Sequence, residues 1–366
     1  LDANTTGGSN VAVGRDALGA NTTASNNTAV GKSALLVNTT GHDNVSVGAN
    51  SLEANTTGDD NTSVGKSSSR SNTTGTRNTA VGFFAYASGT TGGSNVAIGY
   101  AALDANTTAD SNTAVGASAL TANTEGHTNT AVGSEAAASI TTGDENVAIG
   151  HGALDGGTTV NGNTAVGTDT MGSASYSGGN NTAVGYNAML VATSVTGTTA
   201  IGNQCLDALT TGDNNTGVGA AALGAVTTGA QNSALGGFAG DAITTGSNNT
   251  AIGYESLGKL TTGTDNVGVG RAAALDVTTG DGNVAVGVEA MENLTTASNN
   301  TAVGKHAGRD ISTGANNVVI GNDAGHDALT TITTGSNNIV LGNNSTSVFE
   351  TKVSLTVGSD ERDKTD

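Results

Sequence analysis

The side chains that could do chemistry are few in this sequence and lie far apart. Five histidines make no metal-ligand spacing, and we expect them to be solvent-exposed loop residues: His42, His127, His151, His306 and His326. Acids recur in predicted turns, where carboxylates could bind calcium: Asp59, Asp60, Asp144, Asp213 and Asp281. The Gly-Gly-x-Gly-x-Asp calcium repeat is absent, however, and Cys205 is expected to be a buried, inert thiol. The sequence therefore predicts no metal and no other cofactor.

The composition argues against an ordinary globular core around such residues. Of 366 residues, 56 are glycine, 2% are aromatic, and proline and tryptophan are absent. Large apolar side chains are too few to fill a thick interior, so a thin structure is favoured. The formal charge of −19 predicts no nucleic-acid partner, and no apolar run is long enough for membrane insertion. Since residue 1 is leucine and no signal peptide is visible, we expect a segment of a longer protein.

A five-residue phrase of the type Asn-Thr-Ala-Val-Gly recurs twenty times and sets the organisation of the chain. Seventeen of the nineteen intervals are 17 residues long, one is 18 and one is 21. We number the columns of each repeat from the first residue of the phrase, which is Asn10 in the first copy and Asn338 in the last. Seventeen residues are too few for a helix plus a strand and suit one coil of a β-solenoid. The sequence therefore predicts an all-β, parallel β-solenoid or β-roll of about twenty coils, one per repeat.

The columns predict the course of each coil. The fourth column is Val, Ile or Leu in every repeat, the fifth is always Gly, and the ninth is often Leu or Met. Each repeat therefore predicts a short strand, a glycine corner, a second short strand and a Thr/Gly/Asn turn. We expect the fourth and ninth columns to face the interior. Gly150→Val should then disrupt a corner, whereas Asp144→Ala should be nearly silent. Coils stacked at a strand spacing of roughly 4.8 Å would give a rod of about 95–100 Å.

Two further columns bear on assembly and stability. The third column is small and apolar, so the strands are apolar on both faces, which predicts burial on both faces and a seam between parallel chains. The twelfth column is mostly asparagine in the first third of the chain and aliphatic from Leu209 to Ile311. If this column is internal, an amide ladder gives way to an aliphatic ladder. The aliphatic half should be more stable, by roughly 1.5–3 kcal/mol for each buried side chain.

The repeated phrase resembles that of trimeric autotransporter adhesin heads. The sequence "NVAIG" at 95–99 and 146–150 is nearly the phrase that these heads carry once per coil. The adhesin heads are left-handed parallel β-rolls that assemble as trimers. The resemblance covers residues 10–342, although the period here is longer than the family's usual one, and it implies a parallel homotrimer.

The C-terminal sequence "SDERDKTD" at 359–366 resembles the opening of another domain. This is the intramolecular chaperone domain that ends many bacteriophage tail fibres and spikes, trimerises the fibre and then cleaves itself off. That family uses a serine and a lysine five residues later, a spacing that Ser359 and Lys364 match. A neutral Lys364 could accept the Ser359 proton, as in other Ser–Lys pairs. The resemblance implies self-cleavage just before Ser359 as the only catalytic activity.

Together the two resemblances imply a structural protein: the trimeric shaft of a bacteriophage tail fibre that supports host-receptor attachment. Its expected location is the virion, and its expected partners are other virion tail proteins and a host cell-surface glycan or protein. The alternative is a trimeric adhesin at the bacterial cell surface. An ice- or glycan-binding solenoid is disfavoured because adjacent threonines point to opposite faces. An enzyme acting on polysaccharide is disfavoured because the repeat breaks offer no obvious carboxylate pair.

These features divide the chain into three parts. Residues 1–342 are the predicted solenoid shaft, with an irregular insertion near 322–334 that we expect to form a bulged or widened coil. Residues 343–358 are a predicted C-terminal β connector. Residues 359–366 are the expected start of the intramolecular chaperone domain.

Overall fold

Each repeat contributes one three-residue strand, formed by its second to fourth columns. The computed structural model describes residues 1–326 and 332–346, and within them all regular secondary structure is β-strand. β-Branched residues in the second and fourth columns favour this extended segment. The strands are β1 (Val11–Val13), β2 (Thr28–Val30), β3 (Val45–Val47), β4 (Thr62–Val64), β5 (Thr79–Val81), β6 (Val96–Ile98), β7 (Thr113–Val115), β8 (Thr130–Val132), β9 (Val147–Ile149), β10 (Thr164–Val166), β11 (Thr182–Val184), β12 (Thr199–Ile201), β13 (Thr216–Val218), β14 (Ser233–Leu235), β15 (Thr250–Ile252), β16 (Val267–Val269), β17 (Val284–Val286), β18 (Thr301–Val303), β19 (Val318–Ile320) and β20 (Ile339–Leu341).

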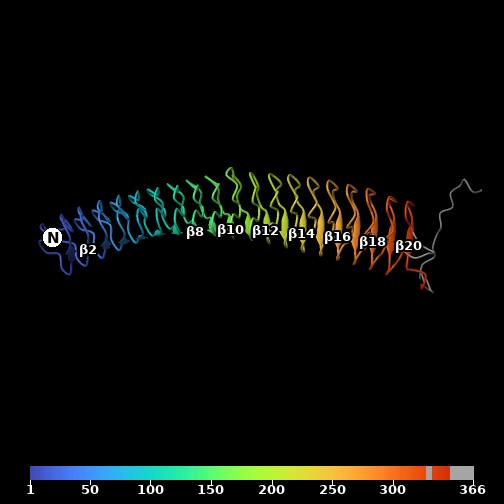
Figure 1. The fold of residues 1–366 in the computed structure, drawn as a ribbon, viewed down its shortest axis with the longest axis horizontal. Helices are drawn as coiled ribbons and strands as arrows, with labels where there is room; N and C mark the ends of the chain where they lie inside the picture. Colours follow the sequence, from blue (N-terminus) through green and yellow to red (C-terminus); the bar gives the residue numbers. More distant parts are fainter. Residues whose placement is uncertain (327–331, 347–366) are drawn as a thin grey trace, which may run out of the picture.

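The strands form one parallel sheet in chain order, with residues of the same column opposite one another. Figure 1 shows a single, gently curved stack of coils running from the N-terminal end to β20. The predicted β-solenoid with one coil per repeat is therefore confirmed. Even the 21-residue interval keeps this register, since Val318 pairs with Ile339. The predicted bulge at 322–334 lies partly outside the described residues, because 327–331 are not among them.

The predicted second strand is wrong. The segment after the glycine corner is a run of turns, because its seventh and ninth columns have left-handed backbones, as in Ser33 (φ 57°) and Leu35 (φ 49°). Alternate residues at positive φ cannot belong to a β-strand. The segment still bonds to neighbouring coils, since the Leu35 amide donates to the Ser51 carbonyl at 3.1 Å. Each coil therefore has one strand and a hydrogen-bonded chain of turns.

The predicted strand faces are inverted. The third column is buried, as at Ala97, whereas the fourth-column Ile98 and Ile149 are each 39% exposed. The interior beside the strand is narrow: a Cβ on Gly217 would lie 2.6 Å from Cys205 Sγ, and the largest fully buried side chain of the third column is Val319. The third column is therefore small because it faces inward, and the β-branched fourth column must face outward. An error of one residue in register exchanges every side chain between the two faces.

The ninth column is internal, as expected, and the twelfth column, whose burial the sequence left open, is internal as well. Leucines of the ninth column are fully buried, and so are the aliphatic residues of the twelfth column from Leu209 to Ile311. In the first third, twelfth-column amides bond from coil to coil, as in Asn55 Nδ2 to Asn38 Oδ1 at 2.9 Å. The amide ladder and the aliphatic ladder therefore both exist. The greater stability of the aliphatic half stays a prediction.

A second amide ladder follows the first column and was not expected from the sequence. It runs along the described coils from Asn10 to Asn338 with Thr198 as its one substitution. Asn232 is typical: its Nδ2 donates to the Gly246 carbonyl at 2.9 Å, and its Oδ1 accepts from the Asn249 amide at 3.0 Å. All of these side chains except those of the terminal Asn10 and Asn338 are buried, so they satisfy backbone groups that water cannot reach.

Tyr86 repairs a break in the twelfth-column ladder, where Gly89 stands in place of asparagine. The Tyr86 ring occupies the missing side chain's space, since a Cβ on Gly89 would lie 2.3 Å from the ring carbons. The Tyr86 hydroxyl donates to the Gly92 carbonyl at 3.0 Å and accepts from Asn95 Nδ2 at 3.3 Å. The Asn72 Oδ1 atom on the preceding coil is left without a partner.

This arrangement predicts that Tyr86→Leu and Gly89→Asn compensate for each other. Tyr86→Leu alone leaves a cavity, and Gly89→Asn alone overlaps the ring, so each should destabilise by about 2 kcal/mol or more. The double variant restores the usual leucine and asparagine of these columns and gives Asn72 Oδ1 a donor. Chemical denaturation should place it within about 1 kcal/mol of the parent chain. A double variant that loses as much unfolding free energy as the two single variants together would show that the two substitutions do not compensate for each other.

Candidate binding surfaces

The structure confirms the expected exposure of some of the five histidines and not of others, and it does not describe the predicted self-cleavage pair. Ser359 and Lys364 lie outside the described residues. His42, His127 and His151 are exposed in turns, as expected. The expectation is wrong for His306, whose side chain is only 19% exposed and lies between Glu289, 3.2 Å away, and Asp323, 2.7 Å away. Stacking of equivalent columns brings these carboxylates from the adjacent coils onto the imidazole. Nearby His326 is half-buried and lies 2.9 Å from Asp310.

The turn acids of the sixteenth column accept hydrogen bonds from the backbone of the preceding coil. Asp59 Oδ1 accepts from the His42 amide at 2.9 Å, and Asp144 Oδ1 accepts from the His127 amide at 2.6 Å. Asp213 and Asp281 make the same contact to the preceding coil. Among residues 1–326 and 332–346, no three His, Cys, Asp or Glu side chains are grouped closely enough to hold a metal ion. The acids of this column therefore act as caps that tie each turn to the next.

Cys205 is a buried thiol of the eighth column, as the sequence indicates. Its Sγ lies 3.4 Å from the Ala222 carbonyl, and burial raises the pKa of the thiol to about 12. Since the thiolate is the reactive form, this environment suppresses its chemistry at neutral pH. A glycine at position 217 on the next coil gives the sulfur room.

The coils of residues 61–94 differ from the rest of the chain in charge. They carry Lys66, Arg70 and Arg77 and no acid, although the whole chain has 12 basic and 31 acidic residues. No further lysine or arginine occurs before Lys259. The adjacent coils return to excess acid, with Glu53, Asp59 and Asp60 before this segment and Asp104 and Asp110 after it. A short cationic strip therefore interrupts an acidic rod.

Exposed aromatic rings lie beside this cationic strip. Phe83 and Tyr100 occupy the sixth column of successive coils, and their rings stack with centroids 5.9 Å apart and planes 16° apart. Phe84 meets Phe83 edge-on at 4.3 Å, and Lys66 Nζ lies 5.6 Å from the centroid of the Phe83 ring. Phe83 is 39% and Tyr100 is 59% exposed. In a chain with so few aromatic residues, this pair of stacked rings forms a local apolar platform.

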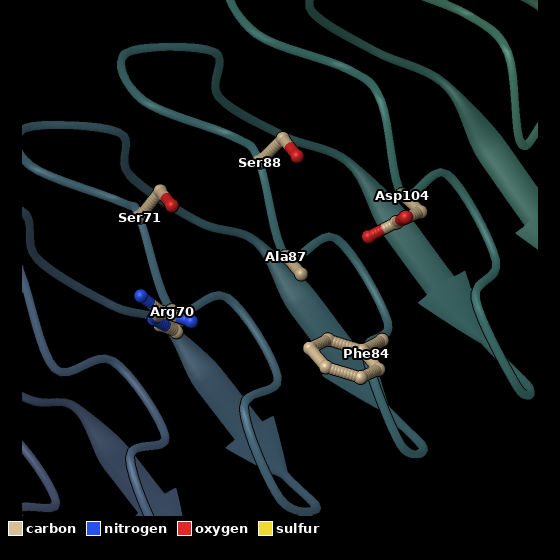
Figure 2. Close-up of a pocket in the computed structure, with 6 residues that line it drawn as sticks. All are labelled: Arg70, Ser71, Phe84, Ala87, Ser88 and Asp104. Carbon is tan, nitrogen blue, oxygen red and sulfur yellow. The ribbon is translucent and has the colours of Figure 1, made fainter.

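A cleft of about 320 Å³ opens beside Phe84. Its lining comes from three successive coils: Arg70, Ser71, Phe84, Ala87, Ser88 and Asp104. Figure 2 shows Arg70 and Asp104 on either side of Ala87 and Phe84, with the two serines along the neighbouring turns. Partial burial raises the pKa of Asp104, and a hydrogen bond from the Ala87 backbone opposes that rise. Arg70 Nε is 3.5 Å from Glu53 Oε2. The cleft thus combines a ring face, hydroxyls, a cation and a carboxylate.

The outer face of the sheet is a second candidate surface. Half-exposed β-branched and leucine side chains of the second and fourth columns follow the rod: Val11, Val13, Val45, Ile98, Val132, Ile149, Ile201, Leu235, Ile252, Val303, Ile320, Ile339 and Leu341. Because the sheet is parallel and in register, equivalent side chains stack in rows along its axis. The fourth column is apolar in every coil, whereas the second column is threonine or serine in most coils. A half-exposed apolar row of this length is characteristic of an interaction site.

Sequence reasoning missed the platform and the cleft, although the signal was present. The run "KSSSRSNTTGTRNTAVGFFAYA" at 66–87 combines three cations and three aromatic residues and contains no acid. Among the residues that the structure describes, no helix is long and apolar enough to cross a membrane.

No protein-family model matches the chain, and no curated protein is significantly similar to it in sequence.

Proposed function

We propose that this chain is the shaft of a bacteriophage tail fibre, built from three parallel copies and supporting attachment to a host receptor. The observation that carries the proposal is the apolar outer face of the sheet. A single solenoid buries the inner face of its strands and leaves this outer face in water. A self-assembling fibre gives that face a partner.

A second copy of the same chain fits this face best. Its apolar rows have the same 17-residue period and therefore the same axial spacing, so contacts between two parallel copies would repeat at every coil. A partner without this period would match only a few coils. The sequence predicted that the small third column would form the contact between chains. In the proposal the β-branched second and fourth columns form it, because the third column is buried inside the coil. The choice of three copies rests on the resemblance to trimeric adhesin heads.

The tail-fibre assignment rests on the C-terminal resemblance. Within the proposal, the segment that begins at Ser359 assembles the fibre and cleaves itself off through Ser359 and Lys364. The chain then contacts other virion tail proteins, and the virion is its location. A trimeric adhesin of the bacterial surface is the alternative and shares the same shaft architecture.

The oligomer predicts a specific response to charge on the outer face. Replacing Ile98, Ile149 and Ile201 together with glutamate places carboxylates against apolar rows, and burying an unpaired charge is costly. Light scattering after size-exclusion chromatography should give the mass of three chains for the parent and the mass of one chain for this triple variant. Circular dichroism should show the same strand content in both, because these side chains lie outside the coil.

The matched control carries the same charges on another face. Thr91, Thr142 and Thr211 are exposed residues of the fourteenth column, and their replacement with glutamate should leave the three-chain mass unchanged. A parent chain that is folded and monomeric at micromolar concentration would overturn the proposal. So would an outer-face triple variant that keeps the mass of three chains.

A further inference from the structure

We infer that the surface formed by Lys66, Arg70, Phe83, Phe84, Tyr100 and Asp104 binds an acidic glycan, a pyranose chain that carries a carboxylate. The inference adds a ligand class to the proposed attachment role and rests on it only for its biological setting. The binding itself does not depend on the number of chains in the fibre.

The aromatic platform suits the apolar face of a sugar ring. Phe83 and Tyr100 stand in the sixth column of adjacent coils and stack with nearly parallel rings, while Lys66 lies over the Phe83 ring. Tyr100, which is 59% exposed, is therefore the ring most open to a ligand, and Phe83 supports it from one side. The C–H groups of a pyranose pack against such ring faces. Two exposed rings, Phe83 and Tyr100, and the partly buried Phe84 replace the small and polar residues that most coils carry in these columns. A local departure from the repeat is typical of a functional site.

The cleft beside Phe84 supplies the polar groups that a sugar needs. Arg70 offers the planar donor fork that pairs with carboxylates, and its present partner Glu53 is a surface contact of 3.5 Å. Ser71 and Ser88 can donate to or accept from sugar hydroxyls, and Asp104 can accept from them. A volume of about 320 Å³ lies at the small end of the range for ligand sites. One sugar unit in the cleft and its neighbours on the platform would use all of these groups.

The charges favour a ligand with an isolated carboxylate. The cationic coils of residues 61–94 lie between acidic coils, with Glu53 on one side and Asp110 on the other. Successive coils are roughly 4.8 Å apart, so the strip without acids is only about 10 Å long. A nucleic acid carries charge on every unit and would meet the flanking acids. A glycan in which neutral sugars separate the carboxylates can place a single carboxylate on the strip.

The test uses defined oligosaccharides and single substitutions. The probes are a hyaluronan tetrasaccharide, in which every second sugar carries a carboxylate, and a chitin tetrasaccharide of the same length without one. Saturation-transfer NMR and calorimetry should show binding of the hyaluronan probe, with the chitin probe at least tenfold weaker. Arg70→Gln should weaken hyaluronan binding at least about tenfold, since one charge-assisted pair is lost. Phe83→Ser should weaken both probes.

Tyr254→Ser is the matched control, because Tyr254 is an exposed sixth-column ring on a coil outside the cationic strip. It should leave hyaluronan binding unchanged. No binding of either probe, equal binding by all variants, or tighter binding of a dT8 oligonucleotide would overturn the inference. Light scattering on the same variants separates this test from the shaft proposal. A loss of oligomer mass on Phe83→Ser would assign the rings to the chain–chain interface instead of a glycan site.

Discussion

Gly236→Ala is expected to destabilise the solenoid by about 2–6 kcal/mol, whereas Gly237→Ala at the next residue should change stability by less than about 0.5 kcal/mol. Gly236 is a fifth-column corner with φ of 142°, and its added Cβ would lie 2.7 Å from the Gly253 carbonyl group. Backbone strain and overlap each contribute about 1–3 kcal/mol. Gly237 has an ordinary φ, and its nearest neighbour is 3.7 Å away.

Denaturant unfolding followed by circular dichroism measures both free energies, and hydrogen exchange shows where protection is lost. Because coils contact only their neighbours, protection should fall first near β14 and β15. Gly150→Val should behave like Gly236→Ala, since its Cβ would lie 2.3 Å from the Gly167 carbonyl oxygen. Equal stability of the two alanine variants would show that the corner does not need glycine.

Asn232→Ala is expected to cost about 2–4 kcal/mol, because the lost side-chain amide leaves two buried groups without partners. These are the Gly246 carbonyl and the Asn249 amide, whereas the Asn215 Oδ1 atom keeps the Asn232 backbone amide as a donor. Asn232→Thr should cost less. Thr198 already occupies this column, and its Oγ1 accepts from the Asn215 amide at 3.3 Å.

The control for this prediction is Asn203→Ala, a substitution of an exposed asparagine, which should be nearly silent in the same denaturation experiment. The order of stability should be parent, then Asn232→Thr, then Asn232→Ala. An Asn232→Ala variant as stable as the parent would show that the first-column ladder contributes nothing to the free energy of unfolding.

The repeat period and the glycine corner could be predicted because each reflects a constraint that acts on every coil. A Cβ in the fifth column would meet the next coil's backbone, so only glycine fits, and the sequence shows only glycine there. Burial of the ninth column could be predicted for a similar reason, since leucine and methionine recur there, whereas burial of the twelfth column stayed open because asparagine and aliphatic residues share it.

Alternation alone could not predict which face of the strand points into the coil. Both the third and the fourth columns are apolar, and the interior face is decided by its width, which admits Ala97 but not Ile98. The turns after the corner were missed because leucine in a left-handed backbone, as at Leu35, has no sequence signature. The first-column asparagines were visible but their burial was not, because an amide becomes internal only through partners on neighbouring coils.

Only part of the candidate glycan surface could be predicted from the sequence. The cations Lys66, Arg70 and Arg77 and the absence of acids around them are sequence facts. Their grouping with Phe84 and Asp104 follows from the stacking of coils, which brings residues 17 or more positions apart to one cleft. A sequence search restricted to histidines and turn acids could not find it.

Electron cryomicroscopy of the assembled protein tests the central claim most directly. The account predicts a rod of about 95–100 Å with an axial repeat of roughly 4.8 Å for each 17-residue unit. End-on views should show three chains that meet through the outer faces of their sheets. A rod of half that length, or a single chain whose β-branched outer face stays in solvent, would contradict the account.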